Sequence, residues 1–182
     1  MAFIFQSKDL TKTFQWVNLP KKDKMVEPRY QDIQPENIPV VELKDGVKVK
    51  VVAGELNGVK GAVTEVATKP TYLDIHLPAN TKFSHPVPAD HNAFSYIYEG
   101  KATFLSGASD TQTLDASNLI SKFSKTTIRS ASYTHINDII IVYEQGADVV
   151  SLETHEKPAR VLLVSGKPIN EPVSRIQFPE LI

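Results

Sequence analysis

The sequence has 182 residues, 41% of them hydrophobic, and its 20 basic and 21 acidic side chains leave a formal net charge of -1. That length predicts one globular domain with room for a short arm, the balanced charge disfavours direct binding to nucleic acid, and the absence of cysteine excludes disulfides and cysteine-ligated metal centres. Because no apolar run could span a bilayer and the first residues do not form a secretory signal, we expect a cytoplasmic or nuclear protein that does not bind membranes.

The first 20 residues read as a strand arm with many large apolar side chains, among them Phe3, Phe5, Phe14 and Trp16. Each such side chain gains roughly 1.5–3 kcal/mol when it is buried. We therefore expect the arm to pack on its own domain, on a protein partner or on a second copy of the chain.

Residues 25–46 hold three prolines and show little periodicity. They predict an extended linker with one helical turn near residues 35–37. We divide the chain into an arm with linker, residues 1–35, and a domain, residues 36–182.

The remaining chain reads as short strands separated by glycine and proline. In residues 71–77, Leu73, Ile75 and Leu77 alternate with the other side chains, which is the period of a half-buried strand. With no convincing helix, this pattern predicts an all-β, antiparallel sandwich or barrel. The expected strands cover residues 47–52, 71–77, 93–100, 102–105, 111–115, 139–143, 149–152 and 160–164.

Two connections between strands are predicted from their proximity in the sequence. We expect strands 71–77 and 93–100 to be joined by a proline-punctuated turn, and strand 102–105 to return as a hairpin after Gly100. Residues 116–138, rich in serine and threonine, fit either a long surface loop or a strand pair.

Several motifs occur in one order along nearly the whole chain: residues 15–20, 24–31, 51–55, 58–61, 72–74, 93–100 and 166–173. Together they resemble the pirin family. The resemblance implies a bicupin, built from two jelly-roll barrels, of which this chain is similar to the C-terminal cupin plus a linking strand arm. It also implies that some members have quercetin dioxygenase activity, and that others are nuclear transcription cofactors that bind proteins.

The resemblance implies that a pirin holds one iron in its N-terminal cupin, through three histidines and a glutamate. We expect the segment that carries those ligands to be absent here, since no His-x-His occurs in the sequence. On the ligand pattern of a cupin, His85 falls near the first histidine and His91 near the glutamate, but Val87 and Val149 replace the other two ligands. We therefore predict no catalytic residue, cofactor or metal.

The weak metal candidates are His85, His91 and His155, for which isolated surface or turn positions are the favoured interpretation. His76 is expected to face solvent, opposite Ile75 and Leu77. A Ser84–His85–Asp90 hydrolase site is disfavoured, because no sequence element provides an oxyanion hole.

A set of aromatic residues is expected to line the barrel interior. Core packing is the favoured interpretation, and a ligand pocket is the alternative. The set comprises Tyr72, Phe94, Tyr96 and Tyr98 as possible pocket residues, with Phe83 and Phe104.

Two functional hypotheses remain open. The favoured one is a non-catalytic module, pirin-like and without iron, that binds a protein partner or forms a homodimer through its arm. The alternative is a small metal-dependent cupin oxygenase that uses His85, His91 and His155.

Overall fold

The computed structural model describes residues 2–5, 13–27, 30–105, 111–114, 139–143, 146 and 149–171. The stretch 116–138 lies outside these residues, as do the side chains of residues 1–16. The described strands are β1 (Ala2–Phe5), β2 (Thr13–Trp16), β3 (Tyr30–Ile33), β4 (Val40–Glu42), β5 (Lys48–Ala53), β6 (Glu55–Leu56), β7 (Val59–Lys60), β8 (Thr71–Leu77), β9 (Lys82–Pro86), β10 (Asn92–Gly100), β11 (Ala102–Leu105), β12 (Thr111–Leu114), β13 (Ile139–Tyr143), β14 (Val149–Glu153) and β15 (Ala159–Gly166).

The described helices are 3-10 turns of three residues each: η1 (Lys21–Asp23), η2 (Pro35–Asn37) and η3 (Lys44–Gly46). Turn η2 confirms the helical turn expected near residues 35–37. In the described part of the chain no helix has the length or apolar character to cross a membrane.

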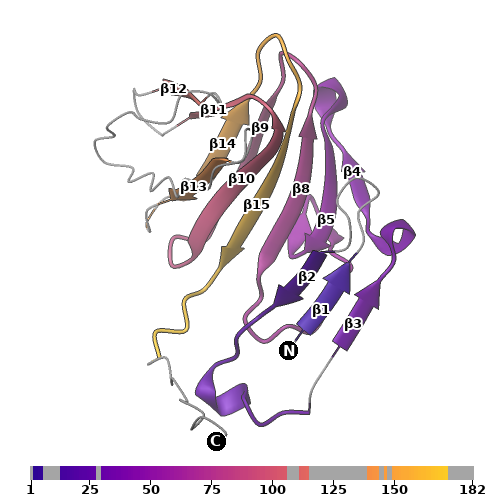
Figure 1. The fold of residues 1–182 in the computed structure, drawn as a ribbon, viewed down its shortest axis with the longest axis vertical. Helices are drawn as coiled ribbons and strands as arrows, with labels where there is room; N and C mark the ends of the chain where they lie inside the picture. The colour runs from indigo at the N-terminus through magenta and orange to yellow at the C-terminus, as the bar shows by residue number, and fades with distance from the viewer. Residues whose placement is uncertain are drawn as a thin grey trace, which may run out of the picture.

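Two antiparallel sheets form the body of the molecule (Figure 1). One has six strands in the order β13-β10-β15-β8-β5-β4, and the other has four in the order β12-β11-β14-β9. The predicted all-β, antiparallel sandwich is therefore confirmed.

The core lies between these sheets and follows the predicted alternation. Leu73, Ile75 and Leu77 are each 0% exposed, as are Val161 and Leu163 on the neighbouring strand β15. Side chains at alternate positions of a strand point to opposite faces, so each inner set meets the opposite sheet. The other core residues include Val47, Val49, Val51, Phe83, Val87, Ala93, Ile97, Ala102, Phe104, Ile141, Val150 and Leu152.

The expected local connections are wrong. Strands β8 and β10 are not neighbours, because β15 lies between them and pairs with both. The proline-containing segment between them forms β9, an edge strand of the other sheet, where Pro86 ends the strand. An edge position tolerates a residue without a backbone N–H.

Strand β11 likewise does not return beside β10, but pairs with β12 and β14 in the other sheet. Gly100 marks the crossing between sheets, with a positive φ of 76°. A Cβ there would lie 2.0 Å from the carbonyl oxygen of Pro158, so a side chain has no room.

The arm forms a three-stranded sheet in which β1 pairs with β2 and, in parallel, with β3. The segment expected to be an extended linker thus contributes strands β3 and β4. Ile33 and the partly buried Val17 join a second apolar cluster, with Val52 and Tyr72, on the outer face of the six-stranded sheet. Figure 1 shows the arm sheet beside the lower parts of β5 and β8.

Candidate functional site

Among the described histidines, His85 is the one that lies inside the sandwich. It lies on β9, is 6% exposed, and its ring stacks on that of Phe83 with the centroids 6.3 Å apart. Burial lowers the pKa of His85, which favours the neutral imidazole. Its Nδ1 atom is buried and makes no hydrogen bond within the described residues.

The expectation of a surface or turn position is therefore wrong for His85. Phe83, His85 and Val87 point inward, whereas Lys82, Ser84 and Pro86 are exposed. This alternation is visible in the sequence, although the prolines around it favour a turn. A period of two from Phe83 to Val87 was the signal that would have identified the strand.

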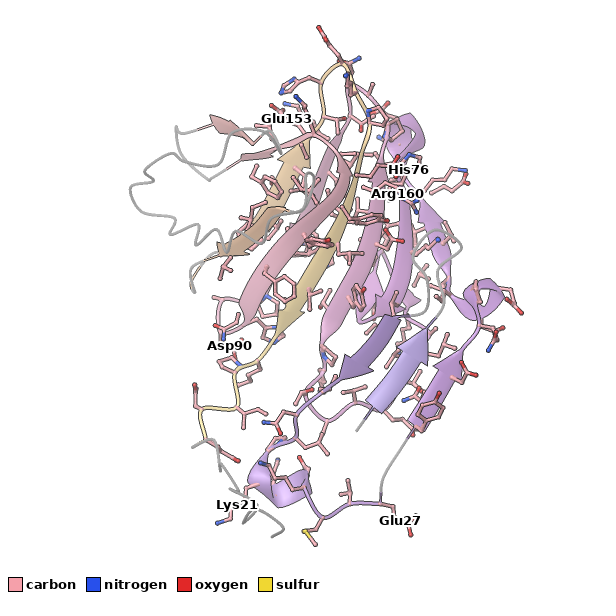
Figure 2. All side chains as sticks on the ribbon, viewed as in Figure 1. Lys21, Glu27, His76, Asp90, Glu153 and Arg160 are labelled. Atoms are coloured by element: carbon pink, nitrogen blue, oxygen red, sulfur yellow. The ribbon has the colours of Figure 1, made fainter. Side chains whose placement is uncertain are left out.

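His91 and His155 lie far from each other. His91 adjoins Asp90 and is partly buried, with a buried Nδ1 that makes no hydrogen bond within the described residues. His155 lies in the loop after β14, with its Nε2 atom 3.7 Å from Glu153 Oε1. Figure 2 shows Asp90 and Glu153 far apart, so the three histidines do not converge.

The described residues contain no group of three or more histidine, aspartate or glutamate side chains placed to hold a metal ion. They do not fit the set of three histidines and one glutamate that the resemblance implies. His135 lies outside them.

A second polar feature of the interior was missed in the sequence. Ser95 Oγ and Tyr143 Oη lie 2.8 Å apart, and Ser95 is fully buried on the inner face of β10. Burial raises the pKa of Tyr143, so its hydroxyl stays protonated. Ser95 stands between Ala93 and Ile97 in the inward set, so the alternation of β10 was the available signal.

The aromatic residues expected inside lie on two different faces. Phe83 and Phe104 belong to the core, but Tyr72, Phe94, Tyr96 and Tyr98 lie on the outer face of the six-stranded sheet. Ala93, Ser95 and Ile97 take the inward positions of β10 instead. A strand pattern identifies which residues share a face, and here the smaller side chains fill the narrow interior.

Charged side chains contact one another on the upper part of this outer face. The Tyr98 hydroxyl donates a hydrogen bond of 2.6 Å to Asp74 Oδ1, and the Arg160 guanidinium lies over the Tyr98 ring at 5.2 Å from its centroid. Lys50 Nζ and Arg160 Nη2 are each 3.9 Å from Asp74 Oδ2. The buried Asp74 carboxylate is thus compensated by two cations and a hydroxyl. His76 is exposed on the same face, as expected (Figure 2).

The lower part of the outer face is apolar and partly uncovered. Phe94 on β10 pairs with Val142 on β13, and these side chains are 39% and 38% exposed. On its other side Phe94 pairs with Val164 of β15, and Tyr96 is one outward position further along β10. We call Phe94, Tyr96, Val142 and Val164 the outer patch.

Comparisons with known proteins agree with this architecture. The family profile of the pirin C-terminal cupin domain matches residues 72–176. This chain belongs to the pirin family. Its antiparallel sandwich is accordingly a cupin fold, as predicted.

Relatives from plants, animals and bacteria match this chain at similar sequence identity. A pirin-like protein of Solanum lycopersicum is 37% identical over 87% of this chain and 46% of its own length, and the pirin of Rattus norvegicus is 35% identical over 87% and 46%. A Pseudomonas aeruginosa protein, provisionally named a quercetin 2,3-dioxygenase, is 35% identical over 87% of this chain and 48% of its own length. The chain therefore spans about half the length of the curated relatives it matches.

Solved structures show the same fold. A quercetin 2,3-dioxygenase from Acinetobacter baumannii superposes with a TM-score of 0.64 at 24% identity, covering 89% of this chain and 47% of that one. Protein GK1651 of Geobacillus kaustophilus superposes with a TM-score of 0.63 at 28% identity, covering 87% and 54%.

Proposed function

We propose that this chain is a non-catalytic cupin module that docks a second cupin domain through its outer patch. The observation that carries the proposal is the pair Phe94 and Val142, two large apolar side chains exposed side by side on the neighbouring strands β10 and β13. Adjacent exposed apolar side chains on a folded domain are typical of an interaction surface.

The length of the relatives supports our choice of a second cupin domain as the occupant. The pirin-like proteins that match here extend over about twice the matched length, so each contains a second portion of similar size. In the family, the resemblance assigns a second cupin to that portion. An apolar sheet face suits such a partner, because the fully buried core of an interface is more apolar than the rest of a protein surface.

The packed interior is the reason for favouring binding over catalysis. The inner faces carry mainly aliphatic and phenylalanine side chains in mutual contact, with His85 as the one histidine among the described interior residues. A single imidazole cannot hold iron in the manner of a cupin oxygenase.

The test is a chimaera in which this chain replaces the matched half of the tomato pirin-like protein. We expect one cooperative unfolding transition in calorimetry, since docked domains unfold together. The pair Phe94→Glu and Val142→Glu should split it into two. The control pair Val40→Glu and Val149→Glu changes valines that are 52% and 47% exposed elsewhere, and should leave one transition. Two transitions in the parent chimaera would contradict the proposal.

A second candidate, a quercetin dioxygenase-like oxygenase, is favoured by one observation: His85 points into the interior with a buried Nδ1 that makes no hydrogen bond within the described residues. Metal analysis of tag-free protein purified without chelator separates the two functions. Near-stoichiometric iron that is lost in His85→Ala would support the oxygenase. Protein without iron supports the binding module.

Homodimerisation through the arm, and a nuclear role as a transcription cofactor, stay predictions. The side chains of Phe3, Phe5, Phe14 and Trp16, which motivated the dimer, lie outside the described residues.

A further inference from the structure

A pocket of about 550 Å³ lies beside the end of β5, between the β6–β7 hairpin and the loop that leads into β8. Its volume lies in the range of small-molecule sites. It shares no residue with the outer patch.

The buried part of the lining, which we call the floor, is apolar. Ala53, Val63 and Val66 are 1%, 6% and 9% exposed, and all three belong to the second apolar cluster. The charged and hydroxyl side chains of the lining, such as Lys60 and Thr64, are exposed, so they lie at the rim of the pocket. A ligand that enters the pocket therefore meets mainly carbon atoms.

The backbone donors of the floor are already paired. Gly61 N donates to the Gly54 carbonyl at 2.8 Å, and Val63 N donates to the Val52 carbonyl at 2.8 Å. A charged group placed on this floor would lose water without gaining a partner, which costs free energy, whereas an apolar group gains from the same burial. The floor thus favours an uncharged, apolar occupant.

Close backbone contacts fix the walls. A Cβ at Gly61 would lie 2.7 Å from the Cα atom of Ala53, so the hairpin packs directly on β5. On the opposite wall, the Gln31 side chain accepts from Thr64 N at 3.5 Å and donates from Nε2 to the Thr64 carbonyl at 3.1 Å. A rigid ring has few internal rotations to lose on binding, so it gains most from a pocket that is already formed.

We propose that this pocket binds an uncharged, apolar ring of a small molecule. The site lies outside the sandwich interior and does not depend on the docking of a second domain.

The experiment is a titration of the full chain with indole, followed by the backbone amide signals of Gly54, Gly61 and Val66 in ¹H–¹⁵N NMR. We expect saturable shifts at these signals. Thr64→Trp and Lys60→Trp each supply a ring from an exposed position of the rim, one from each wall, and should occupy the pocket. In both variants the affinity for indole should fall by about tenfold or more. Two variants on different walls guard against a local folding defect in one of them.

The matched control is Ala67→Trp, which places the same ring at an exposed position of the same loop that does not line the pocket. It should bind indole within about twofold of the parent. The pair Phe94→Glu and Val142→Glu should also leave these shifts unchanged, which separates this site from the outer patch. A parallel titration with glucose, a polar ring, should not saturate the signals. Saturation by glucose, no saturation by indole, or an equal loss of affinity in Ala67→Trp would overturn the proposal.

Discussion

At the scale of single residues, His85 has the most unusual environment. It is an inward-facing imidazole on a stacked phenylalanine, within a mainly apolar interior. Burial penalises the charged form, so the pKa of His85 is lower in the folded protein than in the unfolded chain, where it has its ordinary value of about 6.5.

We therefore expect stability to fall with pH below about 6.5, because the unfolded chain then binds a proton that the folded protein excludes. The full contribution is present above that pH. One proton gives a limiting slope of about 1.4 kcal/mol per pH unit. Urea unfolding between pH 7.5 and pH 5 should show this dependence, and His85→Gln should reduce the slope. An unchanged slope in the variant would assign the effect to another group.

Gly100 is the second decisive residue. Gly100→Ala places a methyl group 2.0 Å from the Pro158 carbonyl oxygen and at a positive φ, so we expect a loss of more than about 2 kcal/mol. Gly58 also has a positive φ, but a Cβ there meets nothing within 4 Å. Gly58→Ala should therefore cost only about 1 kcal/mol of backbone strain. Equal losses in chemical denaturation would show that the close approach is unimportant.

At the scale of elements, side-chain contacts as well as backbone hydrogen bonds join the central strands β8, β15 and β10 of the six-stranded sheet. Asp74 of β8 and Tyr98 of β10 are bonded across β15, which contributes Arg160 to the same cluster. A buried carboxylate that loses a donor remains desolvated, so bonds of this kind contribute more than exposed ones.

Tyr98→Phe should accordingly destabilise the protein by about 1.5–3 kcal/mol, the range for a hydrogen bond to a charged group. Asp74→Asn removes the charge, and in that background Tyr98→Phe should cost clearly less. Free energies of unfolding for the four proteins of this double-mutant cycle provide the measurement. Additive losses would mean that the two side chains act independently.

At the scale of the whole molecule, the six-stranded sheet is covered on both faces over β5 and β8. The sandwich core covers one face, and the arm with residues 61–66 covers the other. The described residues of this cover lie over β5, β8 and β15, whereas Phe94 on β10 and Val142 on β13 are 39% and 38% exposed.

Replacing Ile33 tests whether the arm protects the outer face of the sheet. Ile33 is buried in the second cluster, whereas Tyr30 on the same strand is 59% exposed. Ile33→Ser should cost about 2–4 kcal/mol and increase binding of a hydrophobic dye as Val52 and Tyr72 become accessible. Tyr30→Ser should stay within about 0.5 kcal/mol of the parent. If both variants bind dye equally, the arm does not protect the sheet.

The sequence by itself determined the strand-rich class, the inward set Leu73, Ile75 and Leu77, the turn at residues 35–37 and, through its motifs, the pirin family. These follow from local properties: period-two alternation, proline geometry and the order of short motifs. The tertiary structure alone decided that β15 separates β8 from β10, that His85 points inward and that Tyr96 points outward. Backbone hydrogen bonds are the same for every residue, so a strand does not encode its partner. Alternation sorts side chains onto two faces, and only the packing of the second sheet selects which of those faces becomes the core.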